Sequence, residues 1–346
     1  MTTRLEHLQA TLERPLLVTA PANVRYLTGF RSSNAALLVE PGRARLCTDS
    51  RYIAAARVLP EVEVIDIGRD LYRGLGALLE GEVSFEPEAV TVAALEKLRS
   101  GGASFLVADG LVERLRAVKD SDELAAIRRA AKLTSDAYER LASEPFRGRR
   151  EVDLAWRVRE LFHELGAERE AFPTIVASGP NGAFPHAEPG ERVVQEGDFV
   201  IVDAGAMVAG YCADCTRTFA CGEPSDELRR AYEVCLAAHG GGIGAVRAGA
   251  LTYEVDAAAR RVIEASEFAG CFGHGLGHGV GIEVHEAPSL RAETGETRLE
   301  AGNVVTIEPG IYLEGRGGVR IEDLVVVTEV GAEVLTSAPK QFELVK

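Results

Sequence analysis

Three of the seven histidines in this chain lie within one short segment, residues 272–286, which is rich in glycine. His274 and His278 have the i, i+4 spacing that places two side chains on one face of a helix. However, glycine occupies every second position from 273 to 281, and each glycine costs a helix about 1 kcal/mol relative to alanine. We therefore predict turn or extended backbone for this segment. In such a backbone, one histidine could bind a metal while the other two have different roles, or two histidines could bind the same metal, and the spacing does not favour either arrangement. The alternative without chemistry is a buried loop of hydrogen-bonded histidines.

Two aspartates lie in apolar runs on the N-terminal side of this segment. Residues 198–206 and 211–219 read as two neighbouring buried strands. If they form a hairpin that turns at 208–209, Asp203 and Asp214 lie opposite each other on one face, where like charges destabilise a sheet. The turn residues are not a favoured hairpin pair, so this register is an inference from the pattern.

Two glutamates repeat the arrangement near the C-terminus. The apolar, β-branched runs 304–312 and 318–327 are joined by a glycine-rich stretch. If the chain folds about Gly315, Glu308 lies opposite Glu322. A proline follows Glu308 directly, and because proline cannot donate to a strand ladder, we expect the first strand to bulge or end there.

Burying two carboxylate pairs among valines and isoleucines makes a poor core. Carboxylates that share a site either raise one pKa until that group is protonated or require cations between them. Four carboxylates and a nearby imidazole suit a pair of divalent cations such as Mn²⁺, Co²⁺, Fe²⁺ or Zn²⁺. The alternative is that these acids point to solvent from sheet faces whose opposite sides are buried.

These residues, in their order and spacing, resemble the pita-bread metallopeptidases. The motifs that carry the resemblance are Asp203-x-Gly205, Tyr211-x-x-Asp214-x-Thr-Arg-Thr218, His274-Gly-x-Gly-His278, Val284-His285-Glu286, Thr306-Ile-Glu308-Pro-Gly-Ile-Tyr312 and Gly318-Val-Arg-Ile-Glu322-Asp323. Ser178-Gly-Pro-Asn181 and Pro185-His186-x-x-Pro189 resemble the Xaa-Pro branch of that family, which contains the proline dipeptidases and aminopeptidase P. The resemblance is strong over residues 119–346.

The resemblance implies a dinuclear metal site with five protein ligands. These ligands are Asp203, Asp214, His278, Glu308 and Glu322. Asp214 and Glu322 would bridge two divalent ions per chain, for which we predict Mn²⁺, with Co²⁺ and Zn²⁺ as alternatives. A water held between the metals would be the nucleophile, its pKa lowered by both cations.

The same resemblance implies roles for the residues around the metals. Glu308 would be the general base, and His186 and His285 would stabilise the scissile carbonyl and the tetrahedral intermediate or carry a proton. His274 would line the substrate pocket. Arg320 and Tyr312 would orient the ligand carboxylates.

Residues 1–118 alternate strand-like and helix-like pieces, which is typical of an α/β layer. The strand-like runs begin at residues 16, 35, 44, 62 and 104. The segments 23–30 and 48–52 resemble the amino-terminal domain, named after creatinase, that proline-specific members carry. We thus predict an α+β protein: a creatinase-like α/β domain over 1–118, then a pita-bread catalytic domain over 119–346, with an antiparallel sheet, helices and a pseudo-twofold arrangement.

Helix signals organise the second domain. Asp120 and Glu123 form a capping box that opens a helix to about residue 142. Residues 151–166 and 226–238 read as two further helices. His163 lies within the second of the three, and we interpret it as structural.

Composition bounds the class of protein. The chain has 346 residues, 46% of them hydrophobic, which supports two domains. Its net charge of −15 argues against nucleic acid or an anionic membrane as a partner, because phosphate binding needs a basic face. No stretch approaches the roughly 18 apolar residues of a membrane span, and the first residues lack the apolar core of a signal peptide. Six scattered cysteines fit reduced thiols, so we expect a cytoplasmic protein.

The function predicted is hydrolysis of an Xaa-Pro peptide bond in di- or oligopeptides, by a protein that the resemblance implies is a homodimer. Alternatives are another hydrolase on the same fold, such as a methionine aminopeptidase or a creatinase relative, and a non-catalytic binding module. The sequence does not distinguish a dipeptidase from an aminopeptidase. A dipeptidase needs a cation that binds the free carboxylate of its substrate, whereas an aminopeptidase leaves that end of the site open. Some family dipeptidases have that arginine where this chain has Ser289, and Arg291 lies two positions further on.

Overall fold

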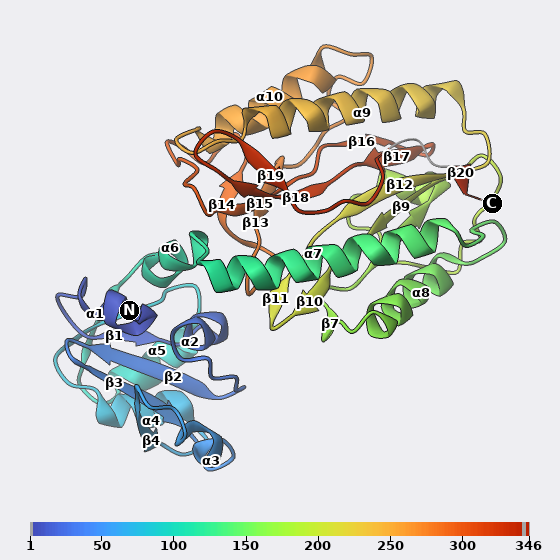
Figure 1. Ribbon diagram of the computed structural model, residues 1–346. Helices are drawn as coiled ribbons and strands as arrows, with labels where there is room; N and C mark the ends of the chain where they lie inside the picture. The colour runs from blue at the N-terminus through green and yellow to red at the C-terminus, as the bar shows by residue number, and fades with distance from the viewer. Residues whose placement is uncertain (1–2, 341–343, 346) are drawn as a thin grey trace. The chain divides into compact units, whose positions relative to one another are not determined.

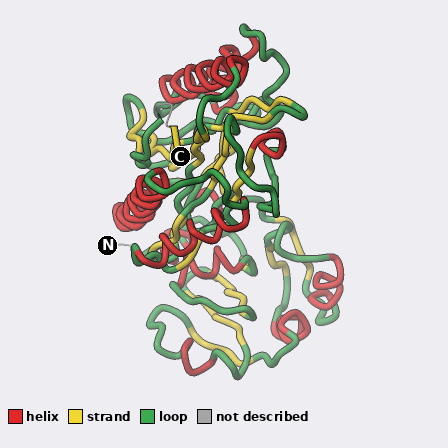
Figure 2. Tube along the Cα trace, turned by 90° about the vertical axis from the view of Figure 1, so that its right-hand side faces the viewer, coloured by secondary structure: helices red, strands yellow, loops and turns green. Residues whose placement is uncertain are grey.

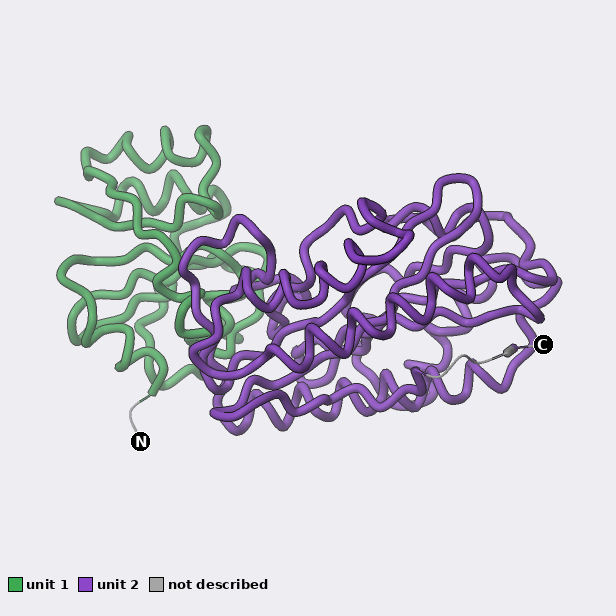
Figure 3. Tube along the Cα trace, turned by 90° about the horizontal axis from the view of Figure 1, so that it is seen from above, with its two compact units in different colours: residues 1–116 green, residues 117–346 purple. Residues whose placement is uncertain are grey.

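The computed structural model describes residues 3–340 and 344–345. The chain divides into two compact units, an N-terminal unit of residues 1–116 and a C-terminal unit of residues 117–346 (Figure 3). Among the described residues, no helix is both long and apolar enough to cross a membrane.

The N-terminal unit is built on a six-stranded mixed sheet with the order β4-β3-β2-β1-β5-β6. Its strands are β1 (Leu16–Val18), β2 (Ala35–Glu40), β3 (Arg43–Thr48), β4 (Glu63–Asp66), β5 (Glu82–Phe85) and β6 (Ser104–Val107). Its helices are α1 (Arg4–Gln9), α2 (Pro21–Thr28), α3 (Ile53–Ala56), α4 (Leu71–Leu78), α5 (Val92–Arg99) and α6 (Leu111–Ala117). The five strands expected from the sequence are present, and β5, a short run, is additional. Leu75 of α4 and Leu98 of α5 pack with Leu17 of β1 in one core.

The C-terminal unit contains two helix pairs and mostly antiparallel sheets. The helices are α7 (Ser121–Ala142), α8 (Glu151–Glu164), α9 (Asp226–Ala245) and α10 (Thr252–Glu264), with a short 3₁₀ helix over Gly179–Ala183. Strands of the first half are β7 (Arg169–Glu170), β8 (Ile175–Ser178), β9 (Phe199–Asp203), β10 (Ala206–Val208), β11 (Tyr211–Cys212) and β12 (Thr216–Cys221). Strands of the second half are β13 (Gly277–Gly279), β14 (Glu286–Leu290), β15 (Val304–Ile307), β16 (Gly310–Leu313), β17 (Gly317–Arg320), β18 (Asp323–Val327), β19 (Ala332–Val334) and β20 (Leu344–Val345).

The two halves of this unit have similar layering. Helices α7 and α8 contact strands β7, β8, β10 and β11 of the first half, whereas α9 and α10 contact β14 to β17 of the second. In Figure 1 the two helix pairs lie on opposite sides of the strands, and Figure 2 shows the strands between helices in a second view. The four-stranded sheet β20-β12-β9-β8 and the five-stranded sheet β14-β13-β15-β18-β19 form the middle layer. This arrangement matches the predicted α+β architecture.

The helix boundaries follow the sequence signals, with one exception. Asp120 caps α7, and Glu123 completes the capping box as predicted. Helix α9 continues to Ala245, past the predicted end at 238, although it contains four glycines after His239. A Cβ atom added at Gly242 would lie 2.8 Å from a methyl carbon of Ile307, so here glycine allows close packing of the helix on the core.

The register of the first carboxylate hairpin differs from the prediction. Asp203 pairs with Thr216 rather than with Asp214. The turn is formed by Ala209 and Gly210, which have φ values of 49° and 74°, and two left-handed residues in succession are typical of a type I′ hairpin. The turn therefore lies one residue later than expected, and Asp214 falls in an irregular segment between β11 and β12.

The second hairpin has the predicted register. Ile307 pairs with Asp323 and Gly310 pairs with Arg320, which is the pairing expected for a fold about Gly315. The strands are interrupted on both sides at the same level, after Ile307 and after Arg320. The break at Pro309 was expected because proline has no N–H to donate.

The histidine-rich segment is extended rather than helical, as predicted, and its glycines allow close approach of the backbone. A Cβ atom at Gly277 would lie 2.0 Å from the carbonyl oxygen of Thr306, whereas one at Gly273 would have no heavy atom within 4 Å. We expect Gly277→Ala to lower the free energy of unfolding by about 1–3 kcal/mol, because β13 must move away from β15. Gly273→Ala is the matched control and should change it by less than about 0.5 kcal/mol. Urea denaturation of both variants measures the difference, and equal midpoints would contradict the packing argument.

Candidate metal centre

A cavity of about 570 Å³ in the C-terminal unit collects most of the residues that the sequence singled out. The predicted site residues that line it are Asp203, Asp214, His278, Glu308, Glu322, His186, His285, His274, Arg320 and Arg291. Tyr312 lies next to the cavity, in contact with Arg320 and His274. The cavity is also lined by Phe172 and Pro173, to which no role was predicted from the sequence.

The carboxylates are presented where strands end. Asp203 is the last residue of β9, and Asp214 lies just before β12. Glu308 follows β15 directly, and Glu322 lies between β17 and β18. At these positions the backbone leaves the sheet ladder, so consecutive side chains are no longer forced to alternate between two faces. This local irregularity lets acidic groups from four segments face one cavity.

Three of these residues form a compact group. Asp214, His278 and Glu322 each offer a ligand atom, and these atoms lie within 4.8 Å of one another. His278 Nε2 also lies 3.3 Å from Glu308 Oε1. The Oδ1 atoms of Asp203 and Asp214 are buried and have no hydrogen-bond partner in the described part of the chain. Buried carboxylate oxygens without partners are costly, and a cation would satisfy them.

The electrostatics of the group point the same way. Burial, together with the negative charges of neighbouring carboxylates, raises the pKa of Asp214 and of Glu322 well above their ordinary values. Burial alone would also raise the pKa of Glu308, but the hydrogen bond and charge of His278 lower it to about 2. The site therefore holds more carboxylates than its own cations can keep ionised. Oxygen ligands with one imidazole fit divalent ions such as Mn²⁺, Co²⁺ or Zn²⁺.

A second layer of side chains holds the carboxylates in place. Arg320 Nη2 donates to Asp203 Oδ2 over 2.7 Å, and Arg320 Nη1 lies 3.1 Å from the hydroxyl of Tyr312. That hydroxyl in turn lies 2.9 Å from His274 Nε2. Tyr312 therefore contacts Arg320 and His274 rather than a carboxylate, so its influence on the acids passes through the guanidinium.

Two threonines for which no role was predicted contact candidate ligands. Thr216 Oγ1 donates to Glu322 Oε2 over 2.7 Å. Thr306 Oγ1 lies 3.2 Å from Glu308 Oε1 and also accepts from the backbone N–H of His278. Both threonines belong to motifs quoted above. The position of Thr306 two residues before Glu308 was a signal in the sequence, whereas nothing local to Thr216 indicated its contact with Glu322.

The remaining predicted residues lie around the compact group. The ring of His285 is centred 4.2 Å from that of His278, and burial together with the neighbouring His278 lowers the pKa of His285. His285 is thus neutral near pH 7 and can donate or accept one proton. His186 is exposed, and Arg291 is exposed and lines the same cavity.

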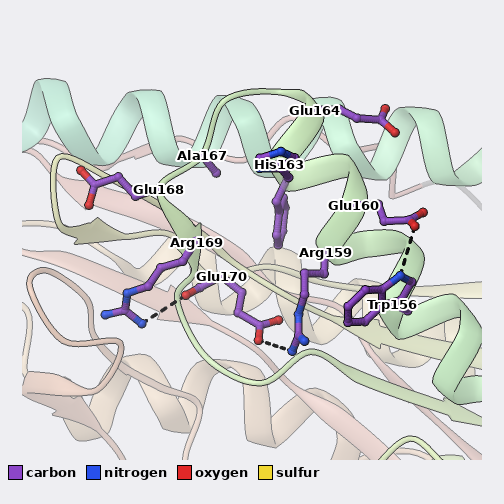
Figure 4. Close-up of a pocket in the computed structure, with 10 residues that line it drawn as sticks. Trp156, Arg159, Glu160, His163, Glu164, Ala167, Glu168, Arg169 and Glu170 are labelled. Atoms are coloured by element: carbon purple, nitrogen blue, oxygen red, sulfur yellow. Dashed lines mark hydrogen bonds and ion pairs between the residues drawn. The ribbon is translucent and has the colours of Figure 1, made fainter.

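A second cavity of similar volume, about 570 Å³, lies against α8 and β7 (Figure 4). It is lined by His163, the histidine interpreted as structural, and by Trp156, whose side chain is 56% exposed. Its polar groups bond to one another: Trp156 Nε1 donates to Glu160, and Arg159 pairs with Glu170. None of the residues predicted to do chemistry lines it.

Comparison with known proteins places this geometry in a family. The family model described as metallopeptidase family M24 matches residues 125–329, more than half of the chain. The chain belongs to this family. A second model, the creatinase/prolidase N-terminal domain, matches residues 4–118 of the M24 peptidase. Membership makes the protein a peptidase and implies divalent metal ions.

Relatives and solved structures agree along most of the M24 peptidase. It is 38% identical to the Xaa-Pro dipeptidase of Pyrococcus furiosus over 71% of this chain and 70% of the relative. The structure of the Xaa-Pro dipeptidase from Bacillus anthracis superposes with a TM-score of 0.93 at 34% identity, covering 98% of each chain. That of the X-Pro aminopeptidase from Thermotoga maritima has a TM-score of 0.88 at 34% identity, covering 99% of this chain and 100% of that one. The predicted pita-bread and creatinase-like architecture is thereby confirmed.

His285 offers a test that separates catalysis from metal binding. We expect His285→Ala to lower kcat by about 10²- to 10⁴-fold, the usual loss for a group that transfers a proton or stabilises the transition state. Metal content should be unchanged, because His278 and the acids remain. Elemental analysis beside peptide hydrolysis measures both quantities, and His163→Ala, in the other cavity, is the control. If His285→Ala lost metal in proportion to activity, His285 would be a ligand.

Proposed function

We propose that this M24 peptidase hydrolyses the peptide bond before proline in short peptides, with Asp203, Asp214, His278, Glu308 and Glu322 holding two divalent ions. The observation that carries the proposal is the convergence of Asp214, His278 and Glu322 within 4.8 Å. The Oδ1 atoms of Asp203 and Asp214 have no hydrogen-bond partner in the described part of the chain, and the cavity also contains three further histidines. The Xaa-Pro specificity named for its relatives supports the substrate class.

We assign each side chain around the cavity a separate role in the reaction. When bound, two divalent cations would lower the pKa of a water molecule and polarise the carbonyl of the scissile bond. The family resemblance makes Glu308 the general base, and its carboxylate, whose pKa burial alone would raise but the neighbouring His278 lowers to about 2, is ionised near neutral pH as that role requires. His285 and His186 lie on the cavity wall, where an imidazole N–H can donate a hydrogen bond to the oxygen that gains charge.

Arg320 would position the acid side chains before the reaction begins. Its guanidinium holds Asp203 and Tyr312 together, and Tyr312 bonds to His274. Because these three contacts fix one face of the cavity, the acids do not have to reorganise when charge develops. His274 thereby becomes part of the wall against which a substrate packs.

Within the Xaa-Pro class, we propose a dipeptidase. Of the described residues, two arginines line the cavity: Arg320, which contacts Asp203, and Arg291, which has no assigned role in the metal centre. Arg291 can therefore pair with the free carboxylate of a dipeptide. Gly275 lets it approach, since a Cβ atom there would lie 2.9 Å from Cβ of Arg291. An aminopeptidase remains the second candidate, because the X-Pro aminopeptidase superposes along the whole chain.

The proposal is tested by stripping the protein of metal and adding back Mn²⁺, Co²⁺ or Zn²⁺. Each form is offered Leu-Pro, Leu-Pro-Pro and a longer X-Pro peptide. Cleavage of Leu-Pro alone is the expected result and supports a dipeptidase. Cleavage of the longer peptides would make the protein an aminopeptidase, and failure with all three substrates and all metals would refute Xaa-Pro hydrolysis.

The role of Arg291 gives a separate prediction. We expect Arg291→Met to raise KM for Leu-Pro by about 10- to 100-fold with little change in kcat, because a charged hydrogen bond to the carboxylate contributes about 1.5–3 kcal/mol. Arg298→Met is the control, since that arginine is exposed and donates to the carbonyl of Gly249. Steady-state kinetics measures the split, and an unchanged KM would remove Arg291 from the substrate site.

Four finer points rest on resemblance and are proposed with it. We propose Mn²⁺ as the working metal and a homodimer as the assembly. We also propose a domain boundary between residues 118 and 119. A cytoplasmic location is supported by the six cysteines, all of which are free thiols. Metal analysis of protein from its source cell and sedimentation velocity test the first two.

A further inference from the structure

A buried cluster of charges lies on the side of the metal-centre strands that faces away from the cavity. At its centre is Arg217 of β12, whose side chain is only 1% exposed. Its Nε lies 3.0 Å from the carbonyl oxygens of both Ala338 and Pro339, and its Nη2 donates to Asp323 Oδ1 over 2.7 Å. Its Nη1 donates to the backbone carbonyl of Glu322. One guanidinium therefore connects the C-terminal segment to the backbone of a candidate metal ligand.

Asp323 is held by the same segment. Lys340 Nζ donates to its Oδ2 over 2.7 Å, and Thr336 Oγ1 donates to its Oδ1 over 2.8 Å. His239 Nε2 lies 3.2 Å from the same Oδ2 atom. Two cations therefore flank the Asp323 carboxylate, Arg217 at Oδ1 and Lys340 at Oδ2. Its charge is matched by Arg217 and Lys340 rather than by the metal centre.

Glu322 is thus held from two directions. Its carboxylate accepts from Thr216 Oγ1 on the cavity side, and its backbone N–H donates to the carbonyl of Thr216. Its backbone carbonyl accepts from Arg217 on the opposite side. Because β17 ends before this residue and β18 begins after it, no ladder partner fixes it. The contacts to Arg217 and Thr216 replace the missing ladder bonds.

Stability alone is a weak reason for such a cluster. Removing several ions from water costs several kcal/mol each, and apolar replacements of buried ion pairs are often neutral or stabilising. A directional network is worth that cost where a side chain must be held within about 0.5 Å of a productive geometry. A ligand that bridges two ions has this requirement, since it must satisfy two coordination shells at once.

We infer that residues 336–340 form a C-terminal clasp that, through Arg217 and Asp323, positions Glu322 for metal binding. The inference rests on the proposed dinuclear site. Arg217, Asp323, Thr336 and Lys340 are positioning residues, because they reach the metal centre only through Glu322. Loosening the clasp lets the Glu322 backbone move and weakens the affinity for metal, while the other four ligands stay in place.

The experiment uses the full chain and reads metal binding rather than activity. Lys340→Met and Thr336→Val each remove one contact to Asp323. Both variants are expected to fold, because Lys340 is partly exposed and valine has nearly the shape of the buried Thr336. The controls are Lys132→Met, which breaks an exposed lysine–aspartate pair on α7, and Thr328→Val, which removes a hydroxyl bonded to the carbonyl of Gly331. Calorimetric titration of metal-free protein with Mn²⁺ gives the dissociation constants. The melting temperature of each metal-free protein is measured beside them.

Both clasp variants should raise the weaker Mn²⁺ dissociation constant by about 10-fold or more, as substitutions behind metal ligands commonly do. The controls should leave it unchanged. Arg217→Lys should fall between wild type and Arg217→Met, because lysine keeps the charge but not the planar fork. A lower metal-free melting temperature with unaltered Mn²⁺ affinity in both Lys340→Met and Thr336→Val would overturn the inference and leave the cluster a stabilising element. Wild-type protein that bound no Mn²⁺ would overturn the proposed function, and the clasp with it.

Discussion

Replacing Asp214 by alanine should abolish both metal binding and hydrolysis of Leu-Pro. Asp214 lies in the compact group with His278 and Glu322. If it bridges two ions, as we propose, its loss removes more than one metal–oxygen bond. We expect activity to fall by more than about 10³-fold, beyond the loss that follows removal of a single oxyanion donor. Glu322→Ala should behave in the same way. Elemental analysis and a peptide assay on the same preparation measure both effects.

The control for this prediction is another acid of the same unit. Asp136 on α7 pairs with Lys132 at the surface, so Asp136→Ala should retain two ions and full activity. Circular dichroism shows whether each variant is folded. A folded Asp214→Ala protein that still held two ions and hydrolysed Leu-Pro would refute the dinuclear assignment.

Metal-free protein should lose stability as pH rises, whereas protein saturated with Mn²⁺ should not. Burial and neighbouring carboxylates raise the pKa of Asp214 and of Glu322 in the folded state. A group whose folded pKa is raised contributes stability that is complete below its unfolded pKa, about 4, and is lost as pH rises through the folded value. The slope reaches about 1.4 kcal/mol per pH unit for each such group. Bound cations remove it, because they stabilise the ionised carboxylates directly.

His274 and His285 oppose this slope at low pH, because burial lowers their pKa and their contribution grows with pH until about 6.5, their unfolded value. Above that pH it is constant, and His278 and Glu308 do not cancel the slope there. The pKa of His278 is raised by Glu308 although burial alone would lower it, so its contribution has the same sign as that of the acids. The pKa of Glu308 is lowered to about 2, so its contribution is present above its unfolded value and is lost only in strong acid. Melting temperatures between about pH 7 and about pH 9, with chelator or with excess Mn²⁺, measure the effect. Parallel curves in the two conditions would contradict it.

The sequence was sufficient for those features that depend on local pattern. The capping box of Asp120 and Glu123 opened a helix where expected, because the side chains that satisfy its first N–H groups are close in the chain. The glycine-rich histidine segment could not be helical, and Pro309 had to interrupt a strand. The residue types of the candidate site were also readable from the sequence, because hard carboxylates and one imidazole in apolar surroundings have few uses other than holding cations.

Features set by contacts between distant segments needed the three-dimensional structure. The register of the first hairpin depended on the backbone conformation of Ala209. Alanine rarely adopts a left-handed conformation, so its residue type did not predict the turn. The hydrogen bond between Thr216 and Glu322 joins residues 106 positions apart, and the one between Arg217 and Ala338 joins residues 121 apart. No local periodicity encodes such pairs, because they arise only when the packing of the two halves brings strand ends together. The amino-acid types at the site therefore determine which chemistry the cavity can support. The packing of the sheets determines which other groups contact these side chains and position them.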